Sequence, residues 1–509
     1  MEDCRNRILQ GHVLDRLREI PDNMVSCVIT SPPYWALRKY NGSEQEQIWG
    51  GRRDCQHNFG NDGKSRTCTS CGAWKGQLGH EENPQLYVDH IVEVFHELRR
   101  VLRSDGVAYL IIADSYAGAK GRSGQKEHNY QVSQAEDGKR FPQKGLKHKD
   151  LCLIPERLAI SLQNDGWYVR SRIAWVKRNP LPGSYKDRRS SSWELVLMLA
   201  KSSHYWYDDD AIREPHTWYG RVQKRKDFYM PSEVDDETSQ AGKARHGRPR
   251  YTDFHPGGRN ARDVIVTVAE PFGYDMCRKC KKVYGRKEYR RLRKSEDKHR
   301  VCICGSTEWT SHCAVFPTAL VRPLILSSCP AWVCSRCGKA RTRIVESTPC
   351  GGIRGTERWR AGGTVGKPQR DHNGKWDYDG KTVGWTDCGC GADWIPGIIL
   401  DPFAGSGTVA VTAENLGRDW LGIEVSQDYV TLAAERIRRD AKRPPLPTTE
   451  NTTMQSSSEK TTSVWCAEQC RQTRVPLIVD LAVAHGIDDY GLQQSDSSDI
   501  VSPSTKREK

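Results

Sequence analysis

The sequence lacks any apolar segment long enough to cross a membrane. Its longest apolar runs, such as residues 107–113, have the length of a strand, whereas a transmembrane helix needs roughly twenty apolar residues. Residues 1–10 are charged and lack the apolar core of a signal peptide. These absences predict a cytoplasmic protein that has no membrane partner.

A disulfide framework is also missing. The 19 cysteines are odd in number, and most of them stand in Cys-x-Cys or Cys-x-x-Cys pairs, which favours metal binding in a reducing compartment. The formal net charge of +14 favours a polyanionic partner, most simply nucleic acid. A basic surface that is merely solvated is the alternative explanation of that charge.

Strands and helices alternate along the chain, which predicts an α/β fold with a buried sheet. The residues Ser104, Asp105 and Gly106 are expected to end the first long helix. Strands are expected at 25–30, 107–113, 167–177, 193–201, 398–400 and 420–425, and helices at 86–102, 154–164, 409–416 and 429–440.

Three segments have too little apolar content for a core. Residues 117–150 are rich in Gly and Lys and predict a mobile lid or a DNA-contacting loop. Residues 213–262 are polar, basic and irregular. From residue 441 the composition predicts disorder, with 475–484 as a small docking helix.

A glycine loop follows the apolar strand at 398–400. Gly405 and Gly407 form a Gly-x-Gly turn before a helix, so the backbone and the helix N-terminus can approach a nucleotide-like ligand. Asp401 can face a positively charged group of that ligand, and Glu424, at the end of the next strand, can accept from ribose hydroxyls. A plain turn is the competing interpretation. The loop carries no Gly-Lys-Ser/Thr, which argues against a triphosphate.

A Pro-Pro loop, Ser31-Pro32-Pro33-Tyr34, follows the strand at 25–30. An exocyclic base amine is a poor nucleophile, and acceptors that face its two N–H bonds stabilise the transition state of its alkylation. The Ser31 hydroxyl and the Pro32 carbonyl can be those acceptors, while Tyr34 can stack on a flipped base and Trp35 can extend the stack. The loop has no cysteine, which disfavours a covalent route to a ring carbon. A simple turn remains the alternative.

Taken together, these motifs resemble those of the beta-class amino-methylating DNA methyltransferases. Residues 29–34 match the signature of the N4-cytosine members. Residues 312–317 resemble a segment that helps enclose the cofactor, and Cys313 stands where the family usually has Pro. Segments 175–177, 192–195 and 200–201 resemble later strands of the family. The matching motifs are 29–34, 312–317, 401–408 and 422–424, and the resemblance spans roughly residues 7 to 440.

The resemblance implies a Rossmann-like, S-adenosylmethionine-dependent methyltransferase sheet with circularly permuted motif order. It implies base flipping and direct methyl transfer to cytosine N4, with adenine N6 left open because both bases present the same amine. The implied catalytic residues are Ser31, Pro32, Pro33 and Tyr34. The implied cofactor-binding residues are Asp401, Phe403, Gly405, Ser406, Gly407, Thr408, Glu424 and Phe316.

Three cysteine clusters have the ligand spacing of structural zinc, four ligands each with no open position. Reduced cysteines without metal are the alternative for each, and His57 is the least certain ligand. The expected ligands are Cys55, His57, Cys68 and Cys71; Cys277, Cys280, Cys302 and Cys304; and Cys334, Cys337, Cys388 and Cys390. Residues 281–300 carry ten Lys or Arg against three acids, which suits contact with phosphates.

The sequence therefore predicts four regions. Residues 1–212 form a catalytic half with a cluster inserted at 50–80, and 213–311 form a target-recognition region with a zinc-ribbon-like insert at 277–304. Residues 312–440 form the cofactor-binding half with a cluster inserted at 334–390, and 441–509 form a disordered tail. DNA is the expected partner, and both a homodimer and a partner restriction nuclease are left open. The sequence itself indicates no nuclease, because it has no Pro-Asp…Glu-x-Lys cluster.

Two other classes of function stay open at this point. The glycine loop alone would also suit an RNA or protein methyltransferase, although the Pro-Pro loop favours a DNA base. A zinc-stabilised DNA-binding module with a decayed enzyme core is the third interpretation, which the intact loop residues oppose.

Overall fold

The computed structural model describes residues 5–38, 40, 42–60, 65–117, 146–180, 183, 185–214, 259–270, 272–295, 299–310, 315–347 and 380–442. Most of the predicted loop at 117–150, most of the segment at 213–262 and nearly all of the tail from 441, with its helix at 475–484, lie outside these residues. His312, Cys313 and Ala314 lie outside them as well.

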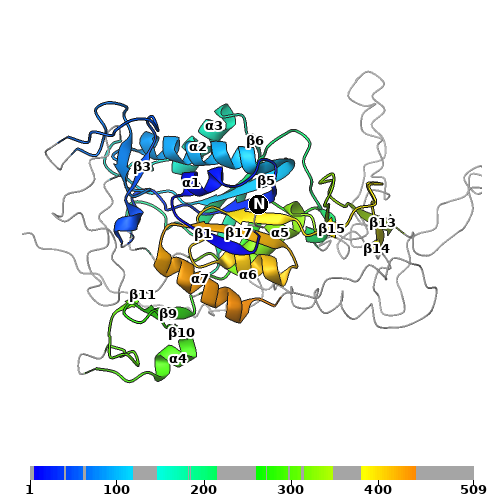
Figure 1. Ribbon diagram of the computed structural model, residues 1–509. Coiled ribbons are helices and arrows are strands. Elements are labelled where there is room, and N and C mark those ends of the chain that lie inside the picture. Colours follow the sequence, from blue (N-terminus) through cyan, green and yellow to red (C-terminus); the bar gives the residue numbers. More distant parts are fainter. Residues whose placement is uncertain are drawn as a thin grey trace, which may run out of the picture. The chain divides into compact units, whose positions relative to one another are not determined.

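An eight-stranded sheet forms the centre of the fold (Figure 1). Its strand order is β1-β17-β16-β2-β5-β7-β6-β8, and only β7 runs against the others. The strands are β1 (Arg7–Gln10), β2 (Val25–Thr30), β5 (Leu102–Ile112), β6 (Tyr168–Lys177), β7 (Trp193–Ala200), β8 (Val264–Thr267), β16 (Ile398–Asp401) and β17 (Asp419–Glu424).

Helices cover both faces of this sheet, as parallel strands require when both of their faces are apolar (Figure 1). One apolar cluster joins the sheet to α1 (Val13–Arg18), α2 (Pro84–Val101) and α3 (Ile154–Asn164). A second cluster joins the other face to α5 (Thr318–Ser328) and α6 (Thr408–Asn415), and α7 (Gln427–Asp440) adds Ile437 to it. The result is a three-layer α/β/α arrangement.

The cysteine clusters lie on small sheets outside this core. The elements of these sheets are β3 (Gln47–Trp49) with β4 (Trp74–Gly76); β9 (Tyr274–Cys277), β10 (Val283–Gly285) and β11 (Trp309–Thr310) with α4 (Arg286–Arg291); β12 (Val333–Cys334) with β15 (Trp394–Ile395); and β13 (Arg343–Ser347) with β14 (Gly380–Trp385). Each small sheet therefore interrupts the main fold as an insertion.

The order of strands along the sheet differs from their order in the chain. The N-terminal β1 pairs in parallel with β17, which lies more than 400 residues later, with Arg7 opposite Leu421. The strand order reverses between β16 and β2, where Ile399 lies opposite Cys27. Ligands of open α/β sheets bind at such a reversal, outside the carboxyl ends of the strands.

The predicted elements agree with the structure apart from one helix end. The first long helix ends at Val101, not at the Ser104-Asp105-Gly106 stretch. These three residues belong to β5, because strand pairing begins at Leu102, which lies opposite Val25. Among the described residues, no helix is both long and apolar enough to span a bilayer.

Candidate active site

The glycine loop and the Pro-Pro loop meet where the strand order reverses. The glycine loop leaves β16 after Asp401, and the Pro-Pro loop leaves the neighbouring β2 after Thr30. The Thr30 hydroxyl donates to Asp401 Oδ1 at 2.8 Å and so ties the two strand ends together. Two segments some 370 residues apart in the chain thus form one site.

Glu424 closes one side of the glycine loop. The backbone N–H of Gly405 donates to its Oε2 at 2.9 Å, and the N–H of Ser426 donates to its Oε1 at 2.9 Å. Each oxygen keeps a further lone pair for a ligand hydroxyl. Burial raises the pKa of Glu424 to about 7, although the N–H groups of Ser426 and Gly405 oppose this rise.

Asp401 has a similar electrostatic environment. Burial raises its pKa to about 7, the bonds from Thr30 and the Phe403 N–H lower it, and the charge of Glu424 raises it again. A nearby positive charge would stabilise the ionised forms of these two buried carboxyl groups. A cationic ligand in the cavity would supply that positive charge.

Gly407 and Arg436 shape the rear of the glycine loop. Gly407 has a φ of +75° and starts α6, and a Cβ there would lie 3.2 Å from the Cβ of Ala433. Arg436 of α7 is 7% exposed and donates from Nη1 to the Ser406 carbonyl, the Ser406 hydroxyl and the Thr408 hydroxyl at 2.8–3.1 Å. The loop is therefore held from behind by charge-assisted bonds.

The Pro-Pro loop is held by the segment that leads into α2. Tyr87 of α2 donates its hydroxyl hydrogen to the Pro33 carbonyl at 2.8 Å, and the Ala36 N–H donates to the Gly79 carbonyl at 2.8 Å. Trp35 is 1% exposed and donates to the Glu81 carbonyl inside the apolar core. The expectation that Trp35 extends a stacking surface is therefore wrong, because its ring anchors the loop from below.

A chain of polar contacts begins at Ser31 and runs away from the loop. The Ser31 hydroxyl donates to the Tyr34 oxygen at 3.2 Å, and the Tyr34 hydroxyl donates to Glu194 Oε2 at 2.9 Å. Lys177 forms an ion pair with the other oxygen of Glu194. Burial, followed by the charge of Glu194, raises the pKa of Tyr34 well above its usual range, so its phenol keeps its proton.

These groups surround one cavity of about 480 Å³. Ten of the twelve residues predicted for catalysis and cofactor binding line it, and Asp401 and Gly407 support the loop from beneath. The predicted residues in the lining are Ser31, Pro32, Pro33, Tyr34, Phe316, Phe403, Gly405, Ser406, Thr408 and Glu424.

Sequence reasoning missed three further residues of this cavity. Lys177 and Glu194 were recognised only as parts of strands, and His12 was not considered at all. The His12 side chain is 10% exposed and packs edge-on against Trp49 at 4.6 Å, and its Nε2 is buried without a hydrogen bond among the described residues. Burial lowers the pKa of His12 to about 4, so the ring is neutral at pH 7. Of these three residues, only Glu194 could have been found from the sequence, because it is an acid beside Trp193 at the start of a predicted strand.

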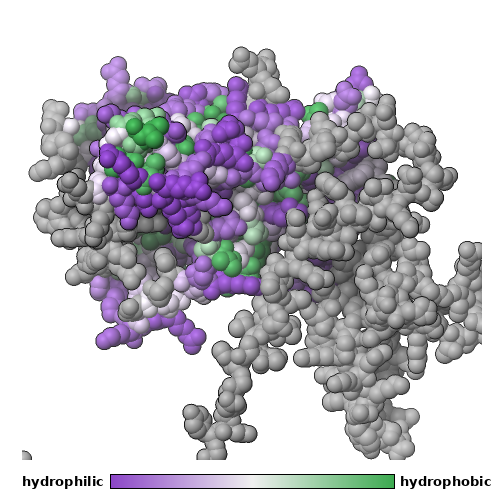
Figure 2. Space-filling view, turned by 90° about the horizontal axis from the view of Figure 1, so that it is seen from below, coloured by the Kyte–Doolittle hydropathy of each residue, from purple (hydrophilic) through white to green (hydrophobic). Residues whose placement is uncertain are grey.

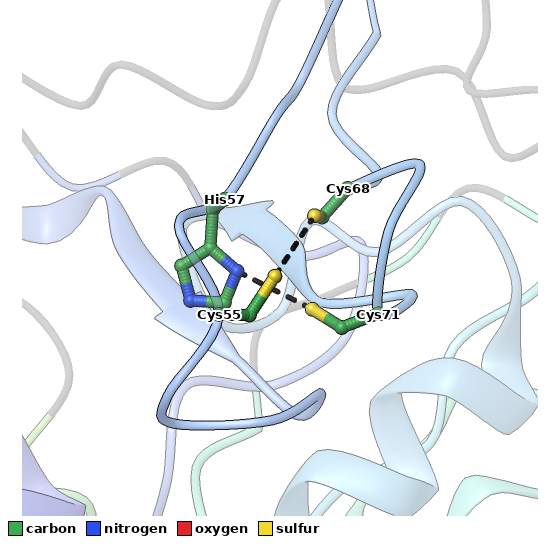
Figure 3. A group of neighbouring side chains, drawn as sticks. All are labelled: Cys55, His57, Cys68 and Cys71. Carbon is green, nitrogen blue, oxygen red and sulfur yellow. Dashed lines mark hydrogen bonds between the residues drawn. The ribbon is translucent and has the colours of Figure 1, made fainter.

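Each predicted cysteine cluster comes together in space. Within each group of four residues, the ligand atoms lie within 4.8 Å of one another. In the first group, shown in Figure 3, Cys55 and Cys68 lie 3.9 Å apart and His57 Nδ1 lies 3.3 Å from Cys71 Sγ. His57 therefore points into the cluster with the cysteines. In the second group, two sulfur pairs are 3.5 and 3.6 Å apart.

Tight turns and backbone N–H groups surround the sulfurs of the first cluster. Gly72 follows the second cysteine of its pair with a φ of +76°, and its N–H donates to the Cys68 carbonyl at 2.9 Å. A side chain would strain this left-handed turn. The Asn58 N–H also donates to Cys68 Sγ at 3.3 Å, a contact that favours a thiolate.

The small sheet of the second cluster packs against α7. Met276 and Val283 of its small sheet pack on Leu432 of α7. Lys281 pairs with Asp428 at 2.6 Å, and Glu288 pairs with Arg439 at 2.9 Å. We call this unit, residues 272–310, the ribbon.

Known proteins are similar in sequence to most of this chain. The chain is 27% identical over 432 residues to the Type II methyltransferase M.Cfr9I of Citrobacter freundii, which covers 85% of this chain and 87% of that protein. It is 35% identical over 217 residues to M.SfiI of Streptomyces fimbriatus, covering 42% and 41%. A solved structure named PvuII DNA methyltransferase (cytosine-N4-specific) has 13% identity and a TM-score of 0.39, covering 84% of this chain and 85% of that one.

The sequence model of one family, described as DNA methylase, matches residues 25–331 and 396–435, which is more than half of the chain. Both loops of the candidate site lie inside these matched segments. The chain belongs to the DNA methylase family of N6 and N4 amino-methyltransferases.

Proposed function

We propose that this enzyme transfers a methyl group from S-adenosylmethionine to the N4 amine of a flipped cytosine in duplex DNA, as a Type II methyltransferase. One observation carries the proposal: Ser31, at the head of the Pro-Pro loop, and Glu424, at the edge of the glycine loop, line the same cavity. The relatives described above carry the name Type II methyltransferase, which supports the same activity.

The residues around the glycine loop fit the cofactor. The buried Glu424 and Asp401 suit a cationic nucleoside, and the cavity of about 480 Å³ has a size typical of small-molecule sites. Glu424 would accept from ribose hydroxyls, and Phe403 and Phe316 would pack on either end of the ligand. Bound there, the sulfonium supplies an electrophilic methyl group.

The Pro-Pro loop provides what the target amine needs. Ser31 and Pro32 line the cavity, so Ser31 Oγ and the Pro32 carbonyl would be the two acceptors. Accepting from both N–H bonds favours a pyramidal, more nucleophilic nitrogen. Tyr34 presents its ring to the same cavity, where a flipped base can stack. The chain's residues therefore orient and polarise the amine, while the C–N bond forms directly.

Cytosine is favoured over adenine by the residue before the two prolines. Serine is the residue of the N4-cytosine signature, whereas an acid or an amide is more common in the adenine enzymes. Adenine N6 is the second candidate, because the same two acceptors would serve either amine. The nature of the methylated base separates the two.

We propose that each cysteine cluster holds one structural zinc ion. Four ligands at the corners of a tetrahedron, with Zn–S bonds of about 2.3 Å, place sulfurs about 3.8 Å apart. The observed sulfur pairs at 3.5, 3.6 and 3.9 Å lie close to that value. All four ligands come from the protein, so these ions would support the insertions and take no part in methyl transfer.

The ribbon and the adjoining segment at 213–262 form our proposed target-recognition region, within residues 213–311. Among the ribbon residues that the structure describes, ten basic side chains are exposed against two exposed acids, Glu288 and Glu308, which suits a phosphate backbone. Figure 2 views the molecule from below relative to Figure 1, and its coloured part shows broad hydrophilic areas with a few hydrophobic patches. The exposed basic residues are Arg278, Lys279, Lys281, Lys282, Arg286, Lys287, Arg290, Arg291, Arg293 and Lys294.

The other boundaries follow from this assignment. We propose a catalytic half at 1–212 and a cofactor-binding half at 312–440, joined in circularly permuted order, with the tail at 441–509 outside both. The parallel pairing of β1 with β17 supports the permutation, because it joins the two halves edge to edge.

Methyl transfer from labelled S-adenosylmethionine tests the proposal. The zinc-loaded protein is incubated with duplex DNA of varied sequence, with RNA and with protein. We expect label on DNA only, and at least a hundredfold less with Ser31→Ala. Label on RNA or protein but not on DNA, or cofactor binding without any transfer, would contradict the proposal.

A further inference from the structure

The polar chain that starts at Ser31 ends on two residues without a role in the proposed function so far. Glu194 is the second residue of β7, and Lys177 is the last residue of β6, on the antiparallel pair of strands beside β5. Both side chains line the active-site cavity, and they are 14% and 26% exposed. A charged pair is costly to desolvate, so its position at the wall of a binding cavity indicates a role in that cavity.

The direction of the hydrogen bonds follows from the chemistry of the groups. An ionised carboxylate only accepts, so the single hydrogen of the Tyr34 hydroxyl is committed to Glu194 at 2.9 Å. In the contact of 3.2 Å between Ser31 Oγ and the Tyr34 oxygen, serine must then be the donor. The hydroxyl hydrogen of Ser31 thus points to Tyr34, and the lone pairs of Ser31 Oγ remain for another partner.

Lys177 engages the carboxylate oxygen of Glu194 that Tyr34 leaves free. Its ammonium group forms the ion pair with Glu194 and lies 4.5 Å from the centre of the Trp175 ring, a second favourable contact for a cation. Trp175 is itself fixed by a bond of 2.7 Å from its Nε1 to the Thr267 hydroxyl.

We propose that Glu194, paired with Lys177, is a positioning residue that makes Ser31 an acceptor toward the target amine. A free serine hydroxyl could rotate and present its hydrogen to the amine nitrogen, where it would engage the lone pair that must attack. Glu194 prevents this through Tyr34, because each hydroxyl in the chain has only one hydrogen to donate. This inference rests on the proposed methylation of an exocyclic amine.

A double-mutant cycle between Tyr34 and Glu194 tests the proposal. Tyr34→Phe keeps the ring but removes the relay, and Glu194→Met keeps the length of the side chain but cannot accept. Each single variant should lower kcat by about ten- to a hundredfold, with the KM for DNA and the Kd for S-adenosylmethionine nearly unchanged. Glu194→Gln, which retains one accepting oxygen, should recover part of the loss.

The decisive prediction is non-additivity. In the Tyr34→Phe background, Glu194→Met should cause no further loss of kcat, because the relay is already broken. The paired change Lys177→Met with Glu194→Met removes both charges and guards against misfolding from an unpaired lysine. Glu156 lies on α3 and forms an exposed ion pair with Arg172 of β6. Glu156→Gln is the matched control and should leave kcat unchanged.

Three outcomes separate the claims. An active wild type with non-additive losses in kcat supports the positioning role. An active wild type with additive losses, or with full kcat in Glu194→Met, overturns this inference and leaves the proposed function standing. A folded, zinc-loaded wild type that methylates no DNA overturns the proposed function and this inference with it.

Discussion

Glu424 stands at the end of β17 with both carboxylate oxygens already accepting backbone N–H groups of Gly405 and Ser426. The side chain thus both shapes the glycine loop and offers its remaining lone pairs to the cavity. Glu424→Gln would point an amide NH2 group at one of those N–H donors. We therefore expect the Kd for S-adenosylmethionine, measured by calorimetry, to rise about tenfold or more.

Glu156→Gln serves as the control for that measurement, because Glu156 lies on α3 in an exposed ion pair. Its Kd should equal that of the wild type. An unchanged Kd in Glu424→Gln would remove Glu424 from the cofactor site.

The raised pKa values of Asp401 and Glu424 predict that cofactor binding depends on pH. Burial raises both values to about 7 from the usual 3.8 and 4.5, so both groups are largely protonated at pH 6. A cationic cofactor binds the carboxylate forms better, so its affinity should fall as the pH drops from 8 to 6, by up to about tenfold per carboxyl group. Calorimetry at the two pH values measures this, and a flat profile would contradict it.

The same shifts have a consequence for the stability of the cofactor-free protein, with the opposite sign. The folded chain binds more protons than the unfolded chain between about pH 4 and pH 7. The contribution of these two groups to the free energy of unfolding is therefore full below pH 4 and is lost as the pH rises through 7. Cofactor binding and stability should thus respond to pH in opposite directions.

Sequence motifs predicted individual residues of the cavity lining where these residues belong to a local turn or a strand end. Ser31 and Tyr34 followed from the Pro-Pro loop, and Glu424 followed from its place at a strand end. Trp35 was misjudged because a sequence does not show which neighbouring aromatic side chain turns inward. Glu194 was missed because its partner Tyr34 is 160 residues away, and only the sheet brings the two together.

At the scale of elements, hydrophobic periodicity predicted the long helices and the buried strands. It failed where elements were short, at β1 and α1, because four to six residues give too little pattern. It also placed the end of α2 too late, since Gly106 suggested a helix stop while pairing with β2 had already made a strand. α5 was missed because it has an internal Pro323 and starts just after Pro317.

The ribbon gives a prediction at this scale. Cys302 is buried and lies 3.5 Å from Cys280 in the second cluster. Cys302→Ser should lower the zinc content by one ion per chain, from three to two, as measured by mass spectrometry of the metal. Without that ion the ribbon loses its core and its docking on α7, so protease cleavage within residues 272–310 should become faster.

A cysteine outside the clusters provides the comparison. Cys152→Ser changes a buried cysteine near the start of α3 and should leave the zinc content at three ions. Equal zinc content in Cys302→Ser and the wild type would contradict a metal site in the ribbon.

At the scale of the whole molecule, the chain order hides the arrangement of the sheet. Two loops that stand near opposite ends of the described chain form one cavity, because β16 and β2 are neighbours and β1 closes the edge beside β17. The motifs predicted the two loops and their chemistry, whereas the cavity that unites them needed the strand order. The ribbon's contacts with α7 were likewise invisible in the sequence, since they join Lys281 to Asp428 across 147 residues.

We propose above that this cavity serves the methylation of the exocyclic amine of cytosine. The most direct test treats DNA of varied sequence with the purified protein and S-adenosylmethionine, digests it to nucleosides and identifies them by mass spectrometry. We expect N4-methylcytosine, reduced at least a hundredfold with Ser31→Ala. N6-methyladenine would contradict the assignment of the base, and DNA without any methylated nucleoside would contradict the proposed function as a whole.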